Sequence, residues 1–190
     1  MTGYAICGSF CTFSASLRVL EGLVKSGEEI QPIMSERAYS IDTRFWLASE
    51  FCECVERLCA KPIIHTIAAA EPLGPKTPLD RLIIAPCTGN TLAKLASGIT
   101  DSAVTMAAKA HLRCDRPLLI ALATNDGLSQ NLANIARLLT RRGVYFVPML
   151  QDDPIGKPHS LVADMKKIPE ALSAMDKGNQ LRPIFLESIK

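Results

Sequence analysis

Short apolar runs alternate along the chain with segments whose apolar residues recur at helical spacing. Short apolar runs bounded by turn residues predict buried strands, whereas apolar residues at i, i+3 and i+4 predict amphipathic helices. The predicted strands span residues 4–7, 30–34, 82–85, 118–123 and 144–149. The predicted helices span residues 15–24, 45–58, 92–112 with a break near Gly98, 128–139, and 161–175 with an interruption at Pro169.

This order of elements predicts a three-layer α/β fold, with a Rossmann-like or flavodoxin-like parallel sheet covered by helices on both faces. The strands are apolar throughout, as expected where both faces of a sheet are buried. We expect a single domain over residues 1–190, with residues 150–190 forming a C-terminal loop and helix packed on it. Ligands of such sheets bind beyond the carboxyl ends of the strands, so the loops that follow the predicted strands are the candidate site.

Charge and composition narrow the function classes. Lys and Arg number 21 against 19 Asp and Glu, and aromatic residues make up 5% of the chain. No large basic field or base-stacking platform is therefore expected, which argues against a nucleic-acid partner. The first predicted strand begins at Tyr4, which leaves no space for a cleavable signal, and no apolar run is long enough for a membrane span. We expect a cytoplasmic protein with reduced thiols.

The seven cysteines include two groups with different surroundings. One group lies in a helical pattern and lacks the CxxC spacing of zinc sites: Cys52, Cys54 and Cys59. We expect these three to pack as small apolar residues, with Cys114 also incidental, and we expect no metal site. The other group lies at predicted strand ends: Cys7, Cys11 and Cys87. We expect these to line or support a site there without acting as nucleophiles.

The loop after the first strand has the outline of a phosphate site. Gly8 permits close approach of the backbone, Ser9 offers a hydroxyl, and a helix follows whose N–H groups favour an anion. Ser35, after the second strand, could offer a hydroxyl to the same phosphate. Each residue could equally serve as a plain helix or turn cap. Neither GxGxxG nor GxxxxGK is present.

The loop after the third strand carries a run of polar residues. Thr88, Asn90 and Thr91 supply donors and acceptors, and Gly89 lets the chain turn. Such groups suit a polar planar ring such as a flavin. A capped turn would explain one or two of these residues but not the whole run.

The segment from Pro86 to Asp101, PCTGNTLAKLASGITD, resembles the PxSxNTxxKxAxGxxD signature of the flavoprotein family of homo-oligomeric flavin-containing cysteine decarboxylases. With the Gly8–Ser9 turn and Ser35, the resemblance covers about residues 3–150. It implies FMN as the cofactor and a closed homo-oligomer, a trimer or a multiple of one. The residues it implies are Gly8, Ser9, Phe10 (through its backbone) and Ser35 at the phosphate, and Thr88, Gly89 and Asn90 near the ring.

The chain departs from two branches of that family. Met106 stands where the prenyltransferase branch has a phosphate-binding Arg. The PxMNxxMW motif of the decarboxylases is reduced to a segment in which Asn125 alone keeps a key position, which puts recognition of a cysteine peptide in doubt. His65 is a candidate for the base that decarboxylases place before the third strand.

Other segments, among them Thr43–Phe45, Ala70–Lys76 and Gln151–Pro154, resemble a further branch of the family. This resemblance implies an FMN-linked oxidoreductase component that works with a separate NAD(P)-binding partner on a dihydropyridine dicarboxylate. Arg44 could hold a carboxylate through its forked guanidinium, Lys76 through a point charge and Asn125 through a neutral donor. Two alternatives stay open: a flavin-dependent decarboxylase of a cysteine-like substrate, and a non-catalytic stabilising component of such a complex.

Overall fold

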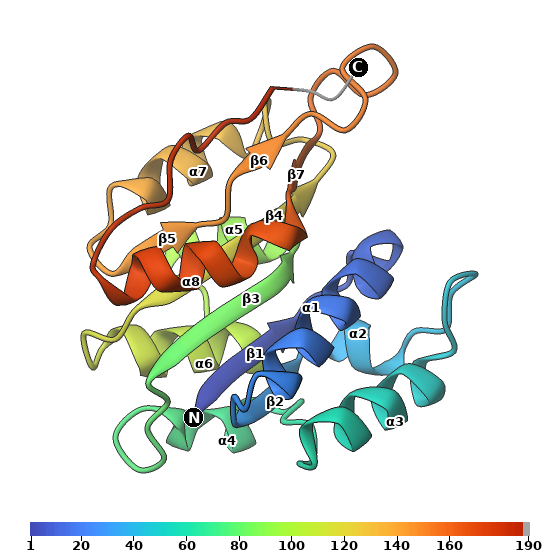
Figure 1. The fold of residues 1–190 in the computed structure, drawn as a ribbon, viewed down its shortest axis with the longest axis vertical. Coiled ribbons are helices and arrows are strands. Elements are labelled where there is room, and N and C mark those ends of the chain that lie inside the picture. The colour runs from blue at the N-terminus through green and yellow to red at the C-terminus, as the bar shows by residue number, and fades with distance from the viewer. Residues whose placement is uncertain (188–190) are drawn as a thin grey trace.

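The computed structural model describes residues 1–187, which form a seven-stranded sheet between two layers of helices (Figure 1). The strands are β1 (Thr2–Ile6), β2 (Ile30–Met34), β3 (Arg81–Cys87), β4 (Leu118–Thr124), β5 (Val144–Phe146), β6 (Met149–Leu150) and β7 (Leu161–Ala163). The α-helices are α1 (Phe13–Lys25), α2 (Glu36–Ser40), α3 (Ala48–Cys59), α4 (Ile67–Ala70), α5 (Gly89–Ser97), α6 (Ala103–Leu112), α7 (Leu132–Leu139) and α8 (Ile168–Asp176). The short 3₁₀ helices are η1 (Phe10–Thr12), η2 (Glu71–Leu73) and η3 (Met165–Lys167).

The predicted fold class is confirmed, but the sheet is mixed rather than wholly parallel. Its strand order is β2-β1-β3-β4-β7-β6, and β5 pairs with the first half of β4. The strands from β1 to β5 pair in parallel, whereas β7 runs antiparallel to both β4 and β6. The predicted strand 144–149 is therefore two strands, β5 and β6, with different partners.

The prediction of one helix over residues 161–175 is wrong at its start. Val162 pairs with Ala123 of β4 on one side and with Leu150 of β6 on the other, so these apolar residues complete the sheet. Pairing with distant strands overrides the local helical spacing. Pro169 does not interrupt the helix, because it lies in the first turn of α8, where a missing N–H costs nothing.

Two further helix boundaries have local causes. The predicted break near Gly98 is confirmed: Gly98 adopts a left-handed φ of 73° and ends α5. The helix predicted from residue 128 begins only at Leu132. The carbonyl of Asp126 accepts hydrogen bonds from the backbone N–H groups of Ser129 and Asn131, so the chain turns there before the helix starts.

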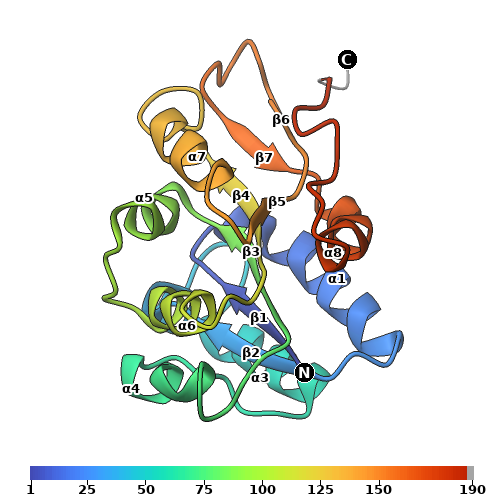
Figure 2. The ribbon, with the colours of Figure 1, turned by 90° about the vertical axis from the view of Figure 1, so that its left-hand side faces the viewer.

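Both faces of the sheet are covered, which is why the strands are apolar throughout. One buried cluster joins the sheet to α1, α3 and α8, and the other joins it to α4, α5, α6 and α7. Figure 2 shows the central strands between α5 and α6 on one side and α1 and α8 on the other. Successive residues of β1 point to opposite layers: Tyr4 packs in the first cluster and Ala5 in the second.

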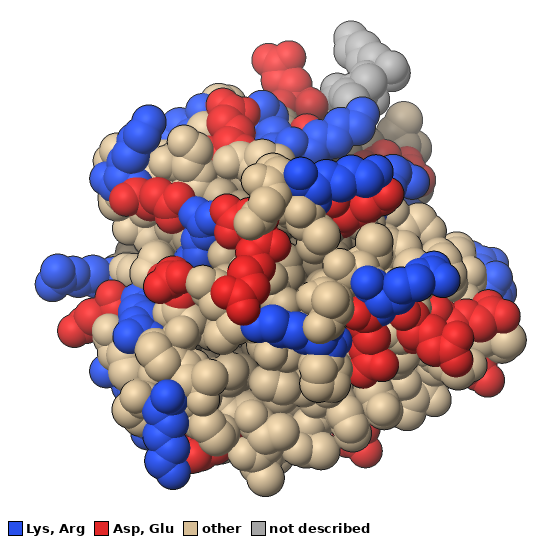
Figure 3. All heavy atoms as spheres, turned by 60° about the horizontal axis from the view of Figure 1, so that its bottom comes forward, with Lys and Arg blue, Asp and Glu red and all other residues tan. Residues whose placement is uncertain are grey.

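Charged side chains of both signs lie interspersed over the face drawn in Figure 3. Within residues 1–187, no helix is both long enough and apolar enough to cross a membrane.

A buried polar group ties α1 to the centre of the sheet. Ser16 Oγ donates a hydrogen bond to the carbonyl oxygen of Ala85 in β3 at 2.6 Å, and the Tyr4 hydroxyl of β1 lies 2.9 Å from the same Oγ. The Tyr4 hydroxyl also donates to the Ser16 carbonyl oxygen at 3.1 Å. Ser16 and Tyr4 are fully buried, so loss of the Ser16 hydroxyl would leave the Ala85 oxygen without this donor.

Ser16→Ala should lower the free energy of unfolding by about 1–3 kcal/mol, because a buried carbonyl loses its hydrogen bond. Urea denaturation measures the change. Ser14→Ala, at an exposed position of the same helix, is the matched control and should change stability by less than about 0.5 kcal/mol. Equal stabilities of the two variants would contradict the structural role of Ser16.

Candidate functional site

A polar cavity of about 320 Å³ lies at the carboxyl ends of β1, β2 and β3. Its lining residues come from the loop after β1, the capped start of α2, the first turns of α5 and the loop that leads into α6: Gly8, Ser35, Glu36, Arg37, Thr88, Asn90, Thr91, Lys94, Asp101 and Ser102. The structure thus brings together Gly8, Ser35, Thr88 and Asn90, four of the seven residues predicted to hold a cofactor. Parallel strands meet at one edge of the sheet, which is why loops far apart in sequence share one cavity.

The first turn of α5 presents donors to this cavity. Thr88 caps the helix: its Oγ1 accepts from the Thr91 backbone N–H at 3.2 Å and lies 3.1 Å from Thr91 Oγ1. Asn90, in the same turn, is exposed. The amino end of a helix carries a partial positive charge and unpaired N–H groups. The arrangement therefore favours an electron-rich ligand.

Gly89 does not line the cavity but occupies a packing position behind it. A Cβ built on Gly89 would lie closest to Thr124 Oγ1, 2.6 Å from Asn131 Nδ2 and 2.9 Å from Asp126 Oδ1. These three side chains form a cluster in which the Asp126 carboxylate accepts from Thr124 Oγ1 and, at 2.9 Å, from Asn131 Nδ2. The absence of a side chain at position 89 thus allows α5 to start directly against β4.

The loop after β1 leaves the backbone open toward the cavity. Gly8 is half-buried, and a Cβ added there would lie 3.3 Å from the Phe10 ring and 3.6 Å from Arg37 Cβ. Ser9 precedes η1, and its side chain makes no capping hydrogen bond. Ser35 Oγ accepts from the Ala38 backbone N–H at 3.3 Å, so its hydroxyl proton remains available to a ligand.

Five lining residues were not assigned roles from the sequence: Glu36, Arg37, Lys94, Asp101 and Ser102. Lys94 and Asp101 are motif positions, and the structure joins them in an ion pair of 2.7 Å. Ser102 caps α6 in a reciprocal arrangement with Thr105. Arg37 stands two residues after Ser35, and that proximity was the one signal the sequence offered for it.

Two cysteines lie directly beneath the cavity. Cys7 and Cys87 are buried, and Thr91 Oγ1 donates to Cys7 Sγ at 3.3 Å. Burial raises the pKa of Cys7 to about 11 and raises the pKa of Cys87 well above its ordinary value. Both therefore remain neutral thiols near pH 7, as expected of packing residues rather than nucleophiles. Cys11, in η1, is exposed.

The structure does not bring the predicted substrate residues into this cavity. Asn125 is exposed just beyond β4, and Arg44 is exposed with its guanidinium 4.8 Å from the centre of the Phe45 ring. Lys76 is exposed in the loop that leads into β3. Figure 1 shows this loop beside the amino terminus, at the end of the sheet where β1 and β3 begin.

His65, the candidate base, lies at the same sheet edge as Ser35 but outside the cavity lining. Ile64, which precedes it, bridges to Ile33 of β2. The His65 ring stacks on Tyr39 with a centroid separation of 3.8 Å and an interplanar angle of 6°.

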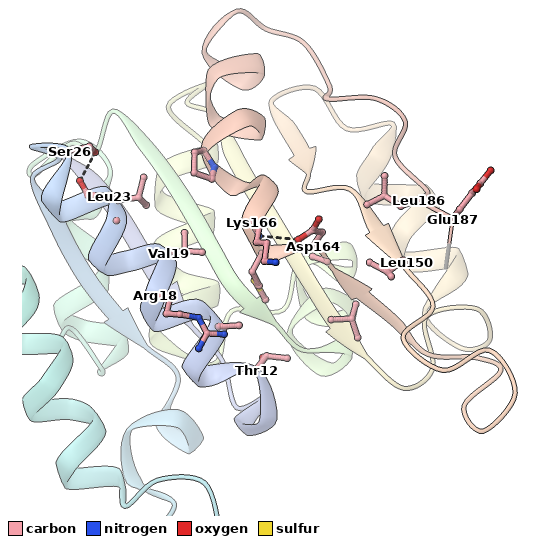
Figure 4. Close-up of a pocket in the computed structure, with 16 residues that line it drawn as sticks. Thr12, Arg18, Val19, Leu23, Ser26, Leu150, Asp164, Lys166, Leu186 and Glu187 are labelled. Carbon is pink, nitrogen blue, oxygen red and sulfur yellow. Dashed lines mark hydrogen bonds between the residues drawn. The ribbon is translucent and has the colours of Figure 1, made fainter. Parts of the chain in front are cut away.

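A larger groove of about 840 Å³ lies between α1 and the β7–α8 region (Figure 4). Val19 and Leu23 line it from α1, and Leu150 and Leu186 from the other side. Its lining is mostly apolar and shares no residue with the lining of the polar cavity. The groove therefore does not match the chemistry of the predicted cofactor.

In three-layer α/β folds, nucleotides and flavins bind at the carboxyl ends of the parallel strands, where this polar cavity lies. A sequence model of the family described as Flavoprotein matches residues 3–177. The chain belongs to this flavoprotein family, as the Pro86–Asp101 signature predicted.

Individual proteins similar to this chain narrow the match within the family. The chain is 42% identical over 186 residues to the B subunit of dipicolinate synthase from Bacillus subtilis (strain 168), covering 98% of this chain and 93% of the relative. The crystal structure of the B subunit of dipicolinate synthase from Bacillus halodurans matches with a TM-score of 0.90 and 40% identity, over 99% of this chain and 96% of that one. The chain is thus a homologue of the dipicolinate synthase B subunit.

A third match is more distant. The structure of AnUbiX (PadA1) in complex with FMN and dimethylallyl pyrophosphate is 26% identical with a TM-score of 0.63, over 77% of this chain and 76% of that one.

Gly89→Ala should disturb the start of α5 and lower stability by about 1–3 kcal/mol, because the added methyl group has no space against the Thr124–Asp126–Asn131 cluster. Urea denaturation checks this. Gly22→Ala is the matched control: position 22 lies in α1 with nothing within 4 Å of an added Cβ, so alanine should raise stability slightly. A Gly89→Ala variant as stable as the parent would contradict the packing role.

Alkylation of the native protein by iodoacetamide at pH 8 should modify Cys11 and spare Cys7 and Cys87, because the latter two are buried thiols with raised pKa values. Peptide mass spectrometry identifies the modified sites. The same reaction in urea is the control and should modify all three. Rapid native modification of Cys7 or Cys87 would show that the thiols beneath the cavity are accessible.

Proposed function

We propose that this chain is the FMN-binding B subunit of a dipicolinate synthase. It contributes to the oxidation of dihydrodipicolinate, or its hydroxylated precursor, to dipicolinate in the cytoplasm of the mother cell of a sporulating bacterium. One observation carries the proposal: the cavity that unites Gly8, Ser35, Thr88 and Asn90 lies in a chain 42% identical to a protein of that name.

The residues present fit FMN. Gly8 carries no side chain that would fill the space beside the Phe10 ring, and the Ser35 hydroxyl can still donate. The backbone of Gly8, Ser9 and Phe10 together with Ser35 would hold the phosphate. Thr88 and Asn90 would face the polar edge of the ring, with Gly89 fixing the helix that carries them.

Oxidation of a dihydropyridine ring to a pyridine removes two electrons and two protons, and a bound flavin supplies an electron acceptor. The protein then has to orient the dicarboxylate and exclude competing reactions. Asn125 is our candidate for a neutral contact to a carboxylate, and His65 remains the candidate base. Asn125, Arg44 and Lys76 all lie outside the cavity within one chain, so we propose them as substrate contacts only where a further chain closes the site.

Two kinds of partner follow from this proposal. An A subunit of the synthase would share the reaction, because the relatives are named as B subunits of dipicolinate synthase. We further propose that this partner binds NAD(P). Copies of this chain would form a closed homo-oligomer, a trimer or a multiple of one. The segment between α2 and α3 supports such contacts, because Ile41, Phe45 and Leu47 are 43%, 46% and 48% exposed.

Purified protein mixed with FMN should quench the flavin fluorescence. Ser9→Asp should raise the dissociation constant about tenfold or more, because it places a negative charge beside the phosphate. Ser173→Asp, at an exposed position of α8, is the control and should bind FMN like the parent. Absence of FMN binding by the parent chain, both by itself and with the NAD(P)-binding partner, would refute the proposal.

Product formation separates the proposal from its alternatives. The chain together with the NAD(P)-binding partner should form dipicolinate, followed by its ultraviolet absorbance, faster than that partner alone. Full activity of the partner alone would favour a non-catalytic stabilising role for this chain. Release of CO₂ from a peptidyl or pantothenoyl cysteine would favour the decarboxylase.

A further inference from the structure

Among the residues that the structure describes, some polar side chains of the cavity already form hydrogen bonds or ion pairs within the protein, whereas that of Arg37 does not. Lys94 is paired with Asp101 at 2.7 Å, and the Ser102 hydroxyl is used in capping α6. Thr88 Oγ1 is used in capping α5. Within residues 1–187, by contrast, the Arg37 side chain forms no hydrogen bond to protein and no ion pair, although it lines the same cavity.

The base of the Arg37 side chain lies directly beside the predicted phosphate loop. Its Cβ lies 3.6 Å from the position that a Cβ on Gly8 would occupy. Ser35, whose hydroxyl can still donate, caps α2 two residues before Arg37. A guanidinium that leaves the backbone at this point can reach a phosphate bound by Gly8 and Ser35, because it presents several N–H donors on a long side chain.

The charges that line the cavity leave Arg37 as the cation that can attract a phosphate. The charged lining residues are Glu36, Arg37, Lys94 and Asp101, and Lys94 neutralises Asp101. Without Arg37 the remaining unbalanced charge would be the Glu36 carboxylate, which repels a phosphate dianion. Arg37 is therefore the one uncommitted cation among the cavity's lining residues.

We propose that Arg37 binds the phosphate of FMN through its guanidinium and confers preference for FMN over riboflavin. The inference rests on the proposed FMN binding and adds to it a residue that selects the phosphorylated flavin. Charge-assisted hydrogen bonds of a guanidinium to phosphate are among the stronger polar contacts in proteins, so removal of the charge should have a measurable effect on affinity.

Fluorescence titrations of the parent chain and the Arg37→Gln variant with FMN and with riboflavin test this directly. Arg37→Gln should raise the dissociation constant for FMN about tenfold or more and leave that for riboflavin within about twofold. Glu36→Gln should have the opposite effect, lowering the dissociation constant for FMN and leaving that for riboflavin unchanged.

Arg57→Gln is the matched control, because Arg57 is exposed on α3 outside the cavity, and it should bind both flavins like the parent. Circular dichroism confirms that the variants are folded. Unchanged FMN affinity in Arg37→Gln, or equal losses for FMN and riboflavin, would overturn the role of Arg37 while leaving FMN binding intact. Failure of the parent chain to bind FMN would overturn both this role and the proposed function.

Discussion

The loops that line the cavity are fixed to one another by buried hydrogen bonds beneath it. Ser16 Oγ of α1 donates to the Ala85 carbonyl oxygen, the Cys7 backbone N–H donates to the Pro86 carbonyl oxygen at 3.1 Å, and Thr91 Oγ1 donates to Cys7 Sγ. The pairing of β3 with β4 shifts register between Ile84 and Cys87, so these groups are held from the β1 side. The position of the Thr88–Asn90 turn relative to Gly8 depends on these bonds.

A second constraint acts from the opposite side of the same turn. The Thr124–Asp126–Asn131 cluster packs against Gly89, so the start of α5 is held between β1 and the loop after β4. Because these loops are already held in place, binding of a ligand costs less conformational entropy than it would if the ligand had to order them. The cavity side chains that remain uncommitted, above all Arg37 and Asn90, are the ones that a ligand can engage.

Much of this arrangement could be predicted from the sequence, because it depends on local signals. Apolar runs mark the buried strands, Gly98 marks the end of α5, and the loops after successive parallel strands mark Gly8, Ser35, Thr88 and Asn90 as neighbours. β7 was missed because its conformation depends on pairing with distant strands.

The parts of the site that were not predicted depend on contacts between distant residues. The packing role of Gly89 depends on side chains after β4, and the significance of Arg37 depends on which neighbouring cations are already paired. Arg44 and Lys76 were selected by resemblance alone. A resemblance marks segments of sequence but does not show where they lie relative to the cavity.

A crystal structure of the chain with bound FMN tests the central claim most directly. The account predicts the phosphate against Gly8, Ser35 and Arg37, with the ring beside Thr88 and Asn90. Flavin bound instead in the apolar groove between α1 and the β7–α8 region would contradict it.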